Sequence, residues 1–89
     1  MLFMVIEHIR DIDAVAARFA ASGRMLPEGV EYIASWGELD GARWFQLMES
    51  PDAAALVEWT KQWDDLVEFE LLPVLSSQDF WRRRDRGPG

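Results

Sequence analysis

The single histidine, His8, is the residue best suited to acid–base chemistry. An imidazole titrates near neutral pH and also serves as an axial ligand of haem iron, so His8 is a candidate general base or haem ligand. It ends an apolar, β-branched segment at residues 2–8 that predicts a strand. The structural alternative is a half-buried histidine at a strand end, hydrogen-bonded to a neighbour or to water.

Aromatic side chains are expected around His8. Residues 43–49 predict another strand, and the Asp40-Gly41 hairpin before it places Trp36 beside Trp44. With the strands 2–8 and 43–49 antiparallel and their centres aligned, one face gathers His8, Trp36, Trp44 and Gln46. The pairs expected from that alignment are His8 with Trp44, Ile6 with Gln46, and Met4 with Met48.

Several glutamates lie in predicted strands, where acidic residues are depleted. Glu7 and Glu49 share a face in this register but lie at opposite ends of it, which argues against a catalytic pair. Glu49 is expected to face the helices, with Trp63 Nε1 or Arg24 as its partner. One histidine, no cysteine and scattered carboxylates do not match a zinc site or a facial triad, so neither a metal nor a cofactor is predicted.

Five tryptophans in so short a chain are unusual. Trp59 and Trp63 recur at helical spacing and predict core positions. Trp36 and Trp44 suit either a protein interface or the wall of an apolar ligand pocket. The candidate ligand-binding residues are Trp36, Trp44, Gln46, Glu49 and Trp63.

Turn and capping signals divide the chain into strands and helices. Asp11 or Asp13 begins a helix that Gly23 ends, and Ser50-Pro51-Asp52 supplies an N-cap, a first-turn proline and an acid for a second helix that Asp64-Asp65 ends. Pro73 argues for an edge strand. Strands are predicted at 2–8, 30–36, 43–49 and 66–74. This order, β-α-β-β-α-β, predicts an α+β, ferredoxin-like domain with two helices on one face of a four-stranded antiparallel sheet of order 4-1-3-2.

Composition narrows the class of protein. Residues 1–77 form one domain with five Arg or Lys and fourteen Asp or Glu, a charge of −9, whereas the tail at 78–89 carries +2. An acidic body disfavours nucleic acid, and no apolar run is long enough to cross a bilayer, so neither nucleic acid nor membrane is an expected partner. The absence of cysteine fits a cytoplasmic protein. The basic tail, with Arg82–Arg86, is expected to form a short helix and then fray.

Both faces of the predicted sheet are apolar, although two helices cover only one. We expect Phe3, Val5, Ile33, Phe45 and Leu47 to face the helices. The other face would expose a large apolar patch, which soluble monomers rarely tolerate. A second copy is the simplest cover, and residues 78–84 folding back as a helix are the alternative. The expected homodimer interface comprises Met4, Ile6, Tyr32, Trp36, Trp44 and Met48.

Four segments carry a family resemblance: MLFMVIEH, GRMLPEGV, WFQLMES and LVEFELLPVLSS. They resemble an uncharacterised family of short bacterial proteins catalogued as a domain of unknown function, which is similar to the dimeric α+β-barrel superfamily. The resemblance covers about residues 1–77, and the tail from Phe80 lies outside it. It implies small-molecule binding and assigns no chemistry, because that superfamily holds monooxygenases, haem-dependent enzymes, isomerases and stress-response proteins.

Two functions follow from these features. The first is a homodimeric accessory module or binding module for a small apolar molecule. The alternative is a small cofactor-independent enzyme of oxygenase or isomerase type, acting on an aromatic or enolisable substrate with His8 as base. A closed pocket beside His8 would favour the enzyme, and a solvent-facing His8 would disfavour it.

Overall fold

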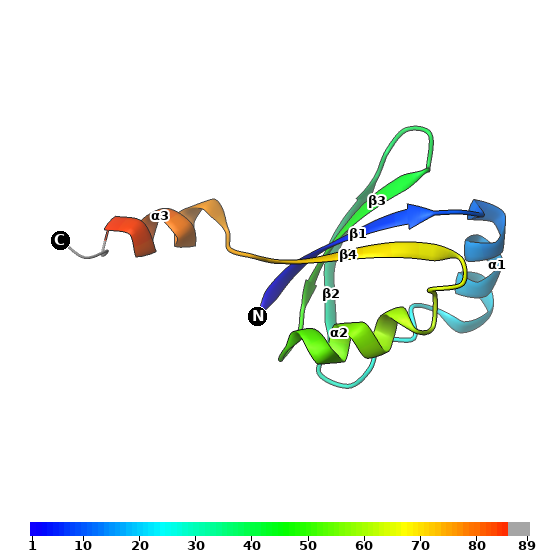
Figure 1. Ribbon diagram of the computed structural model, residues 1–89, viewed down its shortest axis with the longest axis horizontal. Helices are drawn as coiled ribbons and strands as arrows, with labels where there is room; N and C mark the ends of the chain where they lie inside the picture. The colour runs from blue at the N-terminus through cyan, green and yellow to red at the C-terminus, as the bar shows by residue number, and fades with distance from the viewer. Residues whose placement is uncertain (86–89) are drawn as a thin grey trace.

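The computed structural model describes residues 1–85 of the chain. It confirms the α+β class and the β-α-β-β-α-β order, and a third helix follows in the basic tail, where a short helix was expected. Figure 1 shows α1 and α2 on one side of the sheet and α3 standing away from the body. The fraying expected at residues 87–89 lies outside the described part of the chain. The elements are β1 (Leu2–Ile9), α1 (Ile12–Ser22), β2 (Glu31–Gly37), β3 (Arg43–Glu49), α2 (Ala53–Thr60), β4 (Val67–Val74) and α3 (Ser77–Asp85).

The sheet is antiparallel, with the strand order β2-β3-β1-β4, which reads 4-1-3-2 from the β4 edge. β1 and β3 lie at its centre. β4 is an edge strand, and it therefore tolerates Pro73, which has no N–H for a further ladder. The α-amino group of Met1 donates to Glu49 Oε1 and to the Ser50 carbonyl, both at 2.7 Å, which ties the start of β1 to the end of β3.

The pairing of β1 with β3 differs by one residue from the expected register. His8 lies opposite Arg43 rather than Trp44, and it is Glu7 that lies opposite Trp44. A one-residue slip exchanges the two faces of a strand. The expected orientation of β3 is therefore wrong: Trp44 and Met48 face the helices, whereas Phe45 and Leu47 face away. Glu7 and Glu49 consequently lie on opposite faces.

A β-bulge changes the faces of β2 partway along. The register shifts between Tyr32 and Ala34, so Ile33 is the extra residue. Tyr32 pairs with Met48, whereas Trp36 pairs with Phe45 rather than Trp44. The expectation that Tyr32 and Trp36 share a face is therefore wrong.

The core lies between the sheet and α2. Phe3, Val5 and Met48 contribute from the sheet, and all three are almost completely buried. Leu56 and Trp59 contribute from α2 and are buried against them. Trp63 is also buried, but it lies in the turns after α2, because this helix ends at Thr60 and not at the predicted Asp64-Asp65.

The helix caps follow the local side-chain chemistry. Asp11 caps α1 by accepting a hydrogen bond from the Ala14 N–H, and Gly23 ends it with a φ of 66°. α2 begins at Asp52, whose carboxylate accepts from the Ala55 N–H at 2.9 Å. The prediction that Ser50 caps this helix is wrong, because its hydroxyl donates to the Asp52 carbonyl instead.

We call the sheet surface that α1 and α2 leave uncovered the open face. Each of the four strands contributes apolar side chains to its centre, where Trp36 remains 55% exposed and Leu72 44%, whereas ionisable side chains such as His8 and Glu49 lie toward its ends. α3 does not fold back over it, so that alternative is wrong (Figure 1). No helix within residues 1–85 is long and apolar enough to cross a membrane. The apolar side chains of the open face are Met4, Ile6, Ala34, Trp36, Phe45, Leu47 and Leu72.

Candidate functional site

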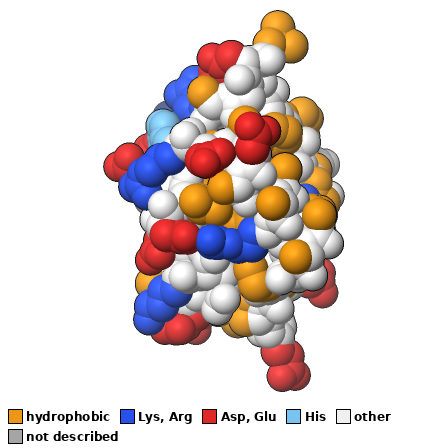
Figure 2. Space-filling view, turned by 90° about the vertical axis from the view of Figure 1, so that its right-hand side faces the viewer, with side chains coloured by type: hydrophobic (Ala, Val, Ile, Leu, Met, Phe, Trp, Pro, Cys, Tyr) orange, Lys and Arg blue, Asp and Glu red, His pale blue; other side chains and the backbone are white. Residues whose placement is uncertain are grey.

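A cavity of about 280 Å³ lies between the sheet and the two helices. Strands β1, β2, β3 and β4 form its floor, and α1 covers it from outside. Ile12 and Phe19 of α1 line the cavity while remaining 46% and 45% exposed, so α1 also forms its rim. Figure 2 faces the α1 end of the molecule and shows hydrophobic side chains gathered there among charged ones.

Three tryptophans form the aromatic walls of this cavity: Trp44 from β3, Trp59 from α2 and Trp63 from the following turn. Trp59 and Trp63 both donate their indole N–H to the Arg24 carbonyl, at 2.8 and 3.1 Å. These bonds hold the loop after α1 against α2. The cavity walls are thus fixed by hydrogen bonds as well as by packing.

Trp44 is positioned by its neighbour across the hairpin. Its ring lies over Gly37, where an added Cβ would come within 2.8 Å of the indole. Its indole N–H donates to the Gly41 carbonyl at 3.0 Å. Glycine at position 37 therefore provides the space that Trp44 fills.

Glu7 is the carboxyl group of the cavity. It lies in β1 between Trp44 of β3 and Phe69 of β4. Burial raises the pKa of Glu7 from an ordinary 4.5 to about 7, although the nearby positive charge of Arg24 opposes that rise. Near neutral pH this carboxyl group therefore exists in both protonation states.

Arg24 and Gln46 are the other strongly polar groups of the cavity. Arg24 Nε lies 3.5 Å from Gln46 Oε1, and its guanidinium stacks over the ring of Tyr32 at 3.7 Å. Among residues 1–85, Arg24 forms no ion pair with a carboxylate. Gln46 is only 5% exposed and donates to Met48 Sδ. The cavity thus combines an apolar body with a positive charge, an amide and a carboxyl group that titrates near neutrality.

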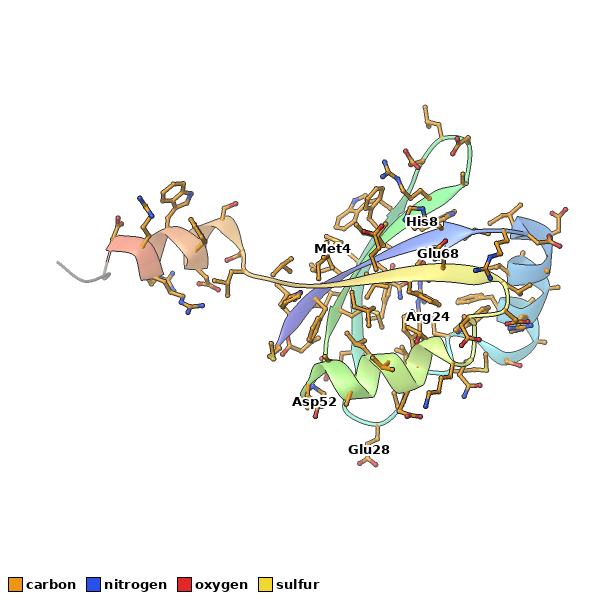
Figure 3. All side chains as sticks on the ribbon, in the orientation of Figure 1. Met4, His8, Arg24, Glu28, Asp52 and Glu68 are labelled. Atoms are coloured by element: carbon orange, nitrogen blue, oxygen red, sulfur yellow. The ribbon has the colours of Figure 1, made fainter. Side chains whose placement is uncertain are left out.

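His8 lies on the other side of the sheet. Figure 3 shows Arg24 on the α2 side and His8, like Met4, on the open face. His8 Nε2 is 2.6 Å from Glu70 Oε2, and both side chains are about half exposed. This geometry matches the structural alternative for His8. The enzyme hypothesis with His8 as base is not favoured, because no part of the 280 Å³ cavity reaches it.

The remaining candidate residues divide between the two faces. Trp44, Gln46 and Trp63 line the cavity, whereas Trp36 and Glu49 lie on the open face. Glu49 pairs with the α-amino group of Met1 rather than with Arg24 or Trp63. Within the described residues, no group of three or more His, Asp or Glu side chains is arranged to hold a metal ion.

Sequence reasoning missed Glu7 and Arg24 as cavity residues. The sequence did contain an indication for Glu7, because acidic residues are rare inside apolar strands and such a position often has a specific role. The one-residue register error directed attention to His8 instead. Arg24 gave no usable signal, since it lies in a loop whose path depends on the bonds from Trp59 and Trp63.

A family model of the type "Domain of unknown function" (DUF3303) matches residues 1–84. The chain belongs to the DUF3303 family. The match extends beyond the expected 1–77 and includes most of α3, so the DUF3303 sequence does not end with the sheet. The architecture of this DUF3303 member is compatible with a ferredoxin-like resemblance. Comparison with curated proteins and with solved structures found no match.

Proposed function

We propose that this protein is a homodimeric binding module whose cavity takes a small aromatic or apolar acid. The observation that carries the proposal is the convergence of Glu7, Arg24 and Gln46 inside a cavity walled by tryptophans. A few oriented polar groups in a mostly apolar concavity are typical of small-molecule sites. At about 280 Å³, the cavity suits a ligand smaller than a typical drug.

The charges of the cavity favour an anionic ligand. Arg24 carries a positive charge and lacks a carboxylate partner among residues 1–85, while a protonated Glu7 adds a hydrogen-bond donor instead of a negative charge. A ligand carboxylate could accept from Arg24, Gln46 and protonated Glu7 together, with its apolar part against the indole rings. Such charge-assisted hydrogen bonds are the strong ones.

Calorimetric titration with three matched probes tests this proposal. Benzoate, phenol and benzylamine share an aromatic ring and differ in charge, so we expect benzoate to bind tightest and benzylamine weakest. Arg24→Gln should weaken benzoate at least about tenfold, since a hydrogen bond to a charged group is worth about 1.5–3 kcal/mol. Arg10→Gln is the control, because Arg10 donates to the Asp64 and Asp65 carbonyls and does not line the cavity. Equal affinities for all three probes would refute an anion site.

The dimer is the second part of the proposal. The open face is apolar in its centre, where Met4, Ile6, Phe45 and Leu47 lie side by side on neighbouring strands. Exposure of a contiguous apolar surface of this kind to water is unfavourable in free energy, and twofold pairing with a second copy would bury it. The ferredoxin-like sheet would then pair with itself as in a dimeric α+β barrel, in a cytoplasmic setting that the absence of cysteine supports.

Light scattering at micromolar concentration tests the dimer. We expect a mass near twice the 10.3 kDa of the chain, and a monomeric mass would overturn this part of the proposal. The cavity lies within one chain, so ligand binding and dimerisation are tested separately.

A further inference from the structure

The C-terminal helix α3 stands away from the rest of the molecule. Leu75 and Ser76 continue the direction of β4 and carry α3 beyond the end of the sheet (Figure 1). Every residue of Ser77–Asp85 is exposed, including Phe80 at 48% and Trp81 at 57%. Their rings contact each other edge-on at 5.3 Å, which still leaves both about half in water.

α3 is nevertheless specified as a helix. Ser76 Oγ accepts from the Asp79 N–H at 3.0 Å, and the Phe80 N–H bonds to the Ser76 carbonyl. Arg82 pairs with Asp79 three residues earlier. A helix of nine residues is too short to be stable alone in water. In addition to these local bonds, α3 therefore needs a surface against which it packs.

The chain itself does not supply that surface, because a hollow lies between α3 and the body. The hollow measures about 640 Å³ and is lined mainly by apolar side chains from the start of β1, the end of β4 and α3. Leu2 and Val74 lie opposite each other on the same sheet side as Met4 and Leu72, so the hollow is continuous with the open face. The Phe80–Trp81 pair forms its outer wall.

The distribution of charge favours a second copy of the chain as the partner of α3. Residues 1–77 carry −9, whereas Arg82, Arg83 and Arg84 give α3 a positive end. A second copy offers both an apolar open face for the aromatic pair and an acidic body for the arginines. Because a twofold dimer uses the same patch on both subunits, an arm on one chain implies a reciprocal arm on the other.

We propose that α3 is an arm that docks on a second copy of this chain. The hollow of each subunit then holds the α3 helix of the other subunit. Phe80 and Trp81 pack against the partner's apolar surface, and the arginines face its carboxylates. This inference rests on the proposed dimer and adds to it a specific contact that face-to-face pairing of sheets alone does not require.

Paramagnetic broadening between chains tests the arm directly. The chain has no cysteine, so Arg84→Cys takes a single nitroxide label on the arm. This nitroxide-labelled chain, at natural ¹⁴N abundance, is mixed with a ¹⁵N-enriched chain that carries no nitroxide, under conditions that exchange subunits. We expect broadening of ¹⁵N amide signals from residues 2–6 and 70–74 of the other subunit. Glu28→Cys, labelled in the loop near α2 (Figure 3), is the control and should leave those signals sharp.

The outcomes separate the arm from the dimer. A dimeric mass with no broadening of residues 2–6 and 70–74 by the label at position 84 would overturn the arm and leave the dimer intact. A monomeric mass would overturn both. Benzoate binding, which involves a cavity within one chain, is unaffected by either result.

Discussion

Replacing Glu7 by glutamine removes a buried titratable group with little change in shape. In the folded chain the pKa of Glu7 is about 7, against an ordinary 4.5, because burial disfavours the charged form. Between these two values the folded chain binds more protons at this position than the unfolded chain does. The free energy of unfolding therefore falls as the pH rises from 4.5 to 7, and the loss is complete above pH 7.

The size of the effect follows from that rise in pKa. It corresponds to a destabilisation of about 3 kcal/mol at pH 8 and of about 1 kcal/mol at pH 5. Glu7→Gln removes the destabilisation at both pH values. The difference in free energy of unfolding between Glu7→Gln and the wild type should therefore grow by about 2 kcal/mol between pH 5 and pH 8.

Urea unfolding of both proteins at pH 5 and pH 8, at one protein concentration, measures this difference. Glu28→Gln is the matched control, because Glu28 lies exposed in the loop before β2 and its replacement should change little at either pH. An advantage of Glu7→Gln that is the same at pH 5 and pH 8 would refute the argument that burial holds Glu7 partly protonated.

Three further substitutions test the packing and the open face. Gly37→Ala places a methyl group against the Trp44 ring and should lower the free energy of unfolding by about 1–3 kcal/mol in a denaturant titration; an unchanged value would mean that Trp44 moves freely. Trp59→Phe deletes one of two hydrogen bonds to the Arg24 carbonyl and shortens a buried ring, so it should cost about 2–3 kcal/mol by thermal unfolding, and a neutral effect would assign the anchoring to the other indole. Leu47→Glu should produce a 10.3 kDa monomer by light scattering, because it would bury an unpaired charge in the interface. Val57→Glu, on the exposed side of α2, is the control and should leave the dimer intact. The same mass for both variants would place the interface elsewhere.

Local signals predicted most of the fold. Gly23, Asp11 and Asp40-Gly41 mark turns and caps through bonds to nearby backbone, so their effect can be inferred without knowing the rest of the molecule. Pro73 likewise indicated an edge strand because proline lacks the N–H that a second neighbour needs. The same local logic failed at Ser50, where two candidate caps compete and the hydrogen bonds of Asp52 decide between them.

The register between β1 and β3 was not predictable from the hydrophobic pattern. Residues on both faces of both strands are apolar, so a shift by one residue still places apolar side chains on each side. That shift decides the candidate site, since it turns Trp44 and Gln46 away from His8 and toward the helices, where they line the cavity beside Glu7. The bulge at Ile33 is equally invisible, because no glycine or proline marks it.

The location of a bound aromatic acid distinguishes the cavity from the open face as the ligand site. Nuclear Overhauser contacts from the ring protons of benzoate would identify the methyl groups around it. We expect contacts to Val15 and Val67, which line the cavity between α1 and the sheet. Contacts to Met4 and Leu47 instead would place the ligand on the open face and overturn the proposed cavity site.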